Sequence, residues 1–231
     1  MIRDRLDPDA IHPARLAGTH AWAAWGLTRR ADPHHLELAI PARHGDSYAQ
    51  DLLREAADRL QQPVWPSPTA PPLVITDRRI ETTDGEHTTT LEILDLPWYL
   101  PDGAAGMPGD AVTVDGWPLV DETTATRLRF EAIDRDGPTE RDVADIATWV
   151  EHKSGQAHAY RRVPTQLDEL VQRTRRASPS ARRGIDALTT HARSQGQRFP
   201  DQRLAMAPIG RIADLLHDQR ERRITAGIGR T

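Results

Sequence analysis

The first third of the chain switches between two hydrophobic periods. From His35 to Pro41 the apolar residues fall at every second position, which is typical of a strand with one buried face. Asp46 or Ser47 can cap a helix whose leucines and alanines recur at helical spacing to about residue 61. An Ala-rich stretch over 14–30 precedes both elements and predicts a short apolar helix or docking segment.

Turn-forming residues divide the part that follows. Five prolines over 62–72 predict a stiff connector. Strands are expected at 73–81 and 87–94, with Asp84-Gly85 between them as a strong hairpin signal. Residues 97–118 hold four Pro and four Gly and predict a long irregular loop, a kind of segment that often carries function.

A second alternating stretch leads into a helical pattern. Residues 126–133 place apolar side chains at every second position and predict another strand. Thr139 and Asp142 match a capping box, and the apolar residues after them predict a helix over about 140–152. Gly155 can end this helix, and 156–163 is compatible with one more strand.

The last third is predicted to be helical. Three helices are expected at 165–176, 180–195 and 208–223, with a break at Ser178-Pro179. The expected fold class is therefore α+β. A mixed-sheet body with βα units over 1–163 would be followed by a helical, Arg-rich region over 164–231.

Composition excludes several classes of protein. The chain has no cysteine, which excludes a disulfide scaffold, a thiolate nucleophile and Cys-ligated zinc. The mean hydropathy is -0.62, and no apolar run approaches the ~18 residues that a membrane span needs. The first residues lack the apolar core of a signal peptide. We therefore expect a cytoplasmic protein without a membrane partner.

Charge is distributed unevenly along the chain. The net charge is -4, but residues 1–160 hold 15 bases against 27 acids, and residues 161–231 hold 15 bases against 7 acids. Such a basic segment is typical of contact with phosphate backbones, DNA or RNA, although docking onto the acidic part would satisfy it too. The candidate nucleic-acid-binding residues flank Ser178-Pro179 and are Arg173, Arg175, Arg176, Arg182 and Arg183.

The single lysine among the 30 basic residues stands in the run Glu151-His152-Lys153. Here the chain resembles the PD-(D/E)xK restriction-endonuclease-like nucleases. The resemblance implies that Glu151 and an upstream acid hold Mg²⁺, while Lys153 orients the attacking water. The upstream acid would be Asp145, Asp134 or Glu131. This arrangement requires a strand over 147–153, whereas the helical pattern makes Lys153 a cation near a helix C-terminus.

A second resemblance is compatible with the helix predicted over about 140–152. Asp134-x-Asp136, followed by Ser154-Gly155 and His158, is similar to the motif order of archaeo-eukaryotic primase-polymerases. It implies a metal ion at the two aspartates and a phosphate at the glycine turn. Asp201 is the best candidate for the third acid of that family. Asp-x-Asp-Gly is also an ordinary turn sequence.

The leading hypothesis is a Mg²⁺-dependent nuclease. One alternative is a non-catalytic nucleic-acid-binding subunit of a nucleoprotein or phage-like assembly, and a second is a primase-polymerase-like nucleotidyltransferase. His34, His35 and His44 form no recognised metal-binding set, and ordinary surface or core positions suit them as well. The catalytic candidates are Glu151, Lys153 and Asp145, and the candidate metal ligands are Asp134, Asp136 and Glu151.

Overall fold

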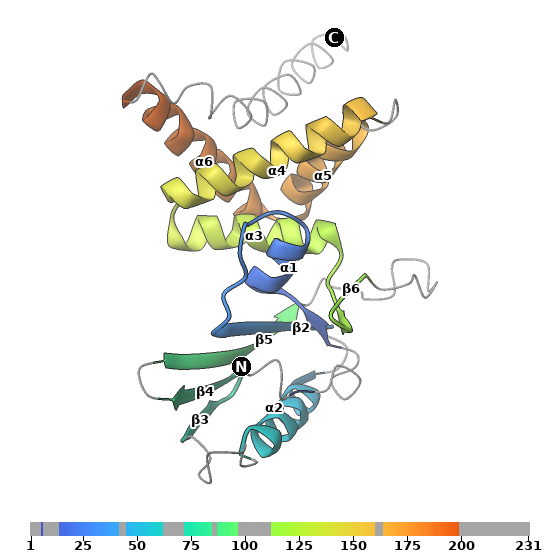
Figure 1. The fold of residues 1–231 in the computed structure, drawn as a ribbon, viewed down its shortest axis with the longest axis vertical. Helices are drawn as coiled ribbons and strands as arrows, with labels where there is room; N and C mark the ends of the chain where they lie inside the picture. The colour runs from blue at the N-terminus through green and yellow to red at the C-terminus, as the bar shows by residue number, and fades with distance from the viewer. Residues whose placement is uncertain are drawn as a thin grey trace, which may run out of the picture. The chain divides into compact units, whose positions relative to one another are not determined.

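The computed structural model describes residue 6 and residues 14–41, 45–61, 72–84, 87–96, 112–159 and 164–198. The chain is α+β, as predicted (Figure 1). It divides into two compact units, one of Met1–Trp25 with Arg30–Ala125 and one of Gly26–Arg29 with Thr126–Thr231. We refer to them as the sheet unit and the helical unit. The sequence pattern predicts a division near residue 163, whereas the units part at Ala125, inside a helix.

Some predicted features lie outside the described residues. They are the helix over 208–223, the third acid Asp201, the proline connector over 62–71, the loop over 97–111 and His44.

The sheet unit is built on five strands in the order β1-β2-β5-β4-β3. The central pair, β2 (His35–Pro41) and β5 (His87–Leu96), is parallel, and α2 (Gly45–Gln61) lies between them in sequence. The flanking strands β1 (Arg15–Leu16), β4 (Arg79–Asp84) and β3 (Leu73–Thr76) pair antiparallel. The pairing of Asp84 with His87 confirms the predicted hairpin.

The two faces of this sheet differ in polarity. One face buries the apolar residues Leu36, Leu38, Ile80, Leu91 and Ile93. The other carries His35 and Glu37 of β2 opposite Thr90 and Glu92 of β5. Figure 1 shows α2 on one side of the sheet and α1 (Gly18–Ala24) on the other. The strand alternation of the sequence therefore separates a core face from a face that is available for chemistry.

Two predicted strands are corrected. The stretch 73–81 is two strands, because Asp77 and Arg78 form a turn between β3 and β4. Residues 126–133 belong to a helix, α3 (Glu122–Asp136). Asp121 caps it by accepting a hydrogen bond from the backbone N–H of Thr124 at 3.0 Å. Its buried stripe is Thr126, Phe130 and Ile133, at helical spacing, so the period-2 pattern of the sequence is coincidental.

The end of the predicted irregular loop is a small hairpin. β6 (Thr113–Val114) pairs with β7 (Trp117–Pro118). Asp115 and Gly116 both have positive φ, which is the geometry of a two-residue type I′ turn.

The helical unit consists of most of α3 with α4 (Glu140–Ala159), α5 (Pro164–Ala177) and α6 (Pro179–Arg198). The predicted capping box is confirmed. The N–H of Thr139 donates to Asp142 Oδ2 at 2.8 Å, and the N–H of Asp142 donates to Thr139 Oγ1 at 3.2 Å. Helix α4 continues through Gly155 to Ala159, so neither the predicted stop nor a strand starting at 156 is present.

Helix α6 begins where the sequence predicts it, and it packs closely against α3. Ser178 caps it by accepting from the N–H of Ala181, with Pro179 in the first turn. At Gly184 a Cβ atom would lie 1.9 Å from the carbonyl oxygen of Phe130, so the two backbones meet without a side chain between them. Within the described segments, no helix has the length and apolar character needed to cross a membrane.

Candidate metal centre

Glu151 and Lys153 lie on α4, which is a helix and not the strand that the nuclease resemblance requires. Residues two positions apart on a helix are separated by about 200° around its axis. Glu151 is accordingly exposed, whereas Lys153 is half-buried. The helix predicted over about 140–152 is confirmed, and the strand over 147–153 that the nuclease resemblance requires is not formed, because Val143, Ile146 and Val150 bury one helical face.

Asp145, the candidate upstream acid, is buried and bound by other residues of the helical unit. Its side chain is 3% exposed, and its Oδ2 accepts a hydrogen bond from Thr28 Oγ1 at 2.7 Å. The Nε atoms of Arg29 and Arg141 each lie 3.7 Å from this carboxylate. Asp145 therefore holds the short segment Gly26–Arg29 against α4.

Asp134 and Asp136 are occupied by protein cations. Asp134 accepts from Arg183 Nη2 at 2.7 Å and from Ser180 Oγ at 2.6 Å, and Asp136 accepts from Arg135 Nε at 2.8 Å. The hydrogen bond from Arg183, with that from Ser180 second, lowers the pKa of Asp134. Neither aspartate belongs to a group of three potential metal ligands in the described part of the chain.

The arginines around Ser178-Pro179 have different surroundings. Arg173 pairs with Glu169 of its own helix, and Arg183 binds Asp134 of α3. Arg175 is half-buried, while Arg176 and Arg182 are exposed. Arg173 and Arg183 therefore bind acidic residues of the helical unit. Nucleic-acid binding by Arg175, Arg176 and Arg182 stays a prediction.

The Asp134–Arg183 pair gives a pH-dependent prediction. Because folding lowers the pKa of Asp134, its stabilising effect is complete above the unfolded value of 3.8 and is lost as pH falls through the lower folded value. We expect Asp134→Asn to be less stable than the wild type near neutral pH, with a difference that shrinks in strong acid. Urea unfolding across this pH range measures it.

Asp136→Asn is the matched control for that measurement. Asp136 pairs with the neighbouring Arg135, and both side chains are mostly exposed. Adjacent residues can pair in the unfolded chain as well, so little stability should depend on this carboxylate. Equal effects of the two substitutions would contradict a specific role for the α3–α6 pair.

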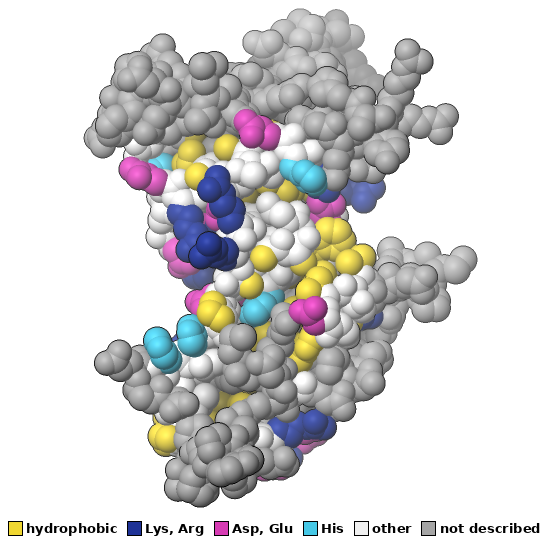
Figure 2. All heavy atoms as spheres, viewed as in Figure 1, with side chains coloured by type: hydrophobic (Ala, Val, Ile, Leu, Met, Phe, Trp, Pro, Cys, Tyr) yellow, Lys and Arg dark blue, Asp and Glu magenta, His cyan; other side chains and the backbone are white. Residues whose placement is uncertain are grey.

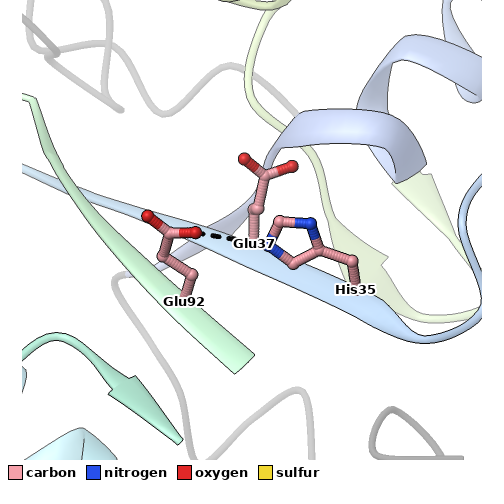
Figure 3. Close-up of side chains that lie close together, drawn as sticks. All are labelled: His35, Glu37 and Glu92. Atoms are coloured by element: carbon pink, nitrogen blue, oxygen red, sulfur yellow. Dashed lines mark hydrogen bonds and ion pairs between the residues drawn. The ribbon is translucent and has the colours of Figure 1, made fainter. Parts of the chain in front are cut away.

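Three side chains on the polar face of the sheet converge. His35 and Glu37 project from β2 and Glu92 projects from β5 (Figure 3). One potential ligand atom of each lies within 4.8 Å of those of the other two. His35 Nε2 is 3.3 Å from Glu92 Oε2, and all three side chains are half-buried. Parallel pairing places Glu37 directly opposite Glu92, which brings together residues 55 positions apart.

A glycine turn lies against this cluster. Gly18 has φ +55°, and a Cβ atom there would lie 1.4 Å from Glu37 Oε2. The absence of a side chain lets the backbone approach the carboxylate, and the N–H of Thr19 donates to Glu37 Oε2 at 3.3 Å. Thr19 Oγ1 also accepts from the N–H of Asp32, in the segment leading to β2. The turn therefore orients Glu37.

The donor set fits a divalent cation. Ligand atoms bound at roughly 2.1 Å around one ion are about 3 to 4 Å apart, which small side-chain rotations here would achieve. Two carboxylates match Mg²⁺ or Mn²⁺, but an imidazole shifts the preference toward Mn²⁺ or Zn²⁺. His35, Glu37 and Glu92 are the residues that would hold such an ion, leaving further coordination positions for substrate or water.

Sequence patterns signalled only part of this cluster. His35 was one of three histidines that could bind a metal, and alternation already placed Glu37 on the polar side of its strand. The pair His35-x-Glu37 is the local sequence feature that indicates two metal ligands on one face of this strand. The pairing of β2 with β5, which adds Glu92, has no local signature in the sequence.

No family model matches the sequence, and no curated protein matches it. Among solved structures, the chain is similar to one titled "Crystal structure of JHP933 from Helicobacter pylori". The TM-score is 0.44 at 14% sequence identity, and the alignment covers 99% of this chain and 94% of that one.

Proposed function

We propose that this chain is a divalent-metal-dependent nucleotidyltransferase with its metal centre at His35, Glu37 and Glu92. The observation that carries the proposal is the convergence of one imidazole and two carboxylates on the polar face of the sheet. This moves the centre away from Glu151 and Lys153, and also from Asp134 and Asp136. Nucleotidyl transfer is one of the alternatives that the sequence leaves open. Bound there, a divalent cation neutralises phosphate charge and polarises the phosphorus–oxygen bonds.

Arg15 supports a phosphate-bearing substrate. It pairs with Ala39, two residues after Glu37, and paired residues point to the same face of a sheet. Arg15 is half-buried and makes no ion pair with a described residue. A guanidinium beside an acidic metal centre suits the phosphates of a nucleoside triphosphate, because its planar fork donates two hydrogen bonds to phosphate oxygens.

In the proposed reaction, different residues bind the metal ion and the phosphates. Glu37, oriented by the Gly18-Thr19 turn, and Glu92 with His35 would hold the divalent cation. Arg15 binds the phosphates that leave. The acceptor hydroxyl attacks the α-phosphorus and loses its proton to water, the bond from that phosphorus to the bridging oxygen breaks, and pyrophosphate departs with the electron pair.

The test is an incubation of the full chain with α-labelled nucleoside triphosphates and RNA or DNA oligonucleotides, in Mn²⁺, Mg²⁺ or EDTA. We expect label to enter the oligonucleotide with Mn²⁺ and not with EDTA. Glu37→Gln and Glu92→Gln should each reduce incorporation by about a hundredfold or more, because they remove charge from the metal centre. Glu81→Gln, on the same face but paired with Arg79, is the matched control.

Each result of this assay has a distinct meaning. Shortened oligonucleotides that are absent with the same glutamate variants would show that this centre has nuclease activity instead of transferase activity. Retarded oligonucleotides without chemistry under any metal would favour the non-catalytic binding protein. Incorporation that survives both glutamate substitutions would refute the proposed centre.

A further inference from the structure

We propose that Arg29 and Arg141 of the helical unit form a second site, which binds a phosphate group. The two side chains approach opposite oxygens of one carboxylate, that of Asp145. Two guanidiniums thus share a single negative charge, and this group of three side chains carries one net positive charge. The inference goes beyond the proposed function and does not require it.

The carboxylate of Asp145 leaves most of the guanidinium donors unused. Each Nε lies 3.7 Å from it, outside the range of about 2.7–3.2 Å for a well-formed N–H···O hydrogen bond. Its Oδ2 already accepts a hydrogen bond from Thr28 at 2.7 Å. The side chains of Arg29 and Arg141 are 67% and 69% exposed, so an anion in solution can reach them.

The position of Arg29 is fixed by a second contact. Its Nη2 donates to Thr148 Oγ1 at 3.3 Å, and that hydroxyl donates to the carbonyl of Ala144 on α4. Arg141 and Asp145 are one helical turn apart on the same helix. Figure 2 shows a group of Lys and Arg side chains on the exposed surface over the beginning of α4. Two guanidiniums held at one carboxylate in this way are preorganised for an oxyanion.

Phosphate is the anion that this arrangement fits. Guanidinium binds phosphate oxygens through paired N–H groups, and two guanidiniums can bind one phosphate from two sides. The phosphate can belong to a nucleic-acid backbone or to a free nucleotide. The experiment therefore includes both sources.

The test measures binding of a short fluorescein-labelled oligonucleotide by anisotropy, in EDTA and over a series of salt concentrations. Arg29→Gln/Arg141→Gln should weaken binding by about tenfold or more and reduce the salt dependence, since two phosphate contacts are lost. Arg54→Gln/Arg59→Gln on α2 changes the net charge equally and should have little effect, because those arginines pair one-to-one with acids. Competition by ATP and by inorganic phosphate identifies the source of the phosphate.

The outcomes separate this site from the metal centre. The measurement contains no metal, so a loss of binding in the arginine variant does not depend on occupancy of the metal centre. Circular dichroism melting shows whether each variant is folded, and Arg29→Lys/Arg141→Lys should retain part of the affinity through charge alone. Equal affinity and salt dependence in the wild type and in the folded double glutamine variant, with no competition by ATP or phosphate, would overturn the proposal.

Discussion

Replacing Gly184 by alanine is expected to lower the free energy of unfolding by about 3 kcal/mol, because the added methyl group overlaps the backbone of α3. The added Cβ would lie 1.9 Å from the carbonyl oxygen of Phe130 and 2.8 Å from its carbonyl carbon. Both are backbone atoms of α3, so no side-chain rotation relieves the overlap. The two helices must move apart, and Phe130 and Ile185 lose contacts in the core.

Gly137→Ala separates this effect from the general cost of replacing a glycine. Gly137 has φ +82° and no atom within 4 Å of where its Cβ would lie. Alanine there meets only the strain of the left-handed conformation, about 1 kcal/mol. Urea unfolding of both variants measures the difference. A Gly184→Ala variant no less stable than Gly137→Ala would show that α3 and α6 do not pack as closely as described.

Gly18→Ala is expected to affect the metal centre more than stability. Positive φ should cost about 1 kcal/mol of folding stability, as at Gly137. The added methyl group would also occupy the position of the Glu37 carboxylate, which is the mobile end of a side chain and is displaced instead of the backbone. Disturbing a group that orients a metal ligand typically costs 10–100-fold in affinity, and we expect a loss of about that size for Mn²⁺.

Electron paramagnetic resonance of free Mn²⁺ measures this affinity directly. Gly137→Ala is again the control, because it introduces the same backbone strain in the other unit. Wild-type Mn²⁺ affinity in a folded Gly18→Ala variant would show that Glu37 is not a ligand in the position described here.

The elements that the sequence predicts correctly are those with local signals. The Thr139–Asp142 capping box, the Ser178-Pro179 break and the Asp84-Gly85 turn depend on residues within a few positions of one another. The prediction fails at 126–133, where Leu128, Phe130 and Ala132 imitate a strand. The helix there begins at Glu122, after the capping residue Asp121, and its buried stripe includes Thr126, a polar residue that a search for apolar periodicity does not count.

The candidate site cannot be predicted from sequence patterns, for a different reason. The chemistry-bearing residues that stand out locally, Glu151, Lys153 and the aspartates of Asp134-x-Asp136, are separated by helix geometry or bonded to arginines. Those that converge come from two strands whose pairing depends on the packing of the whole sheet. No residue near Glu92 indicates that its partner is Glu37, because parallel register is fixed by tertiary structure.

The allocation of Gly26–Arg29 to the helical unit has a consequence for genetic dissection of the protein. These four residues are encoded between two stretches of the sheet unit, so neither unit corresponds to one continuous segment of the gene. A fragment that begins at Thr126 lacks Thr28, and the buried carboxylate of Asp145 then loses its hydroxyl donor. Recombination that exchanges each unit as one continuous gene segment separates Thr28 from Asp145. A functional chimera must take the short loop and α4 from the same parent.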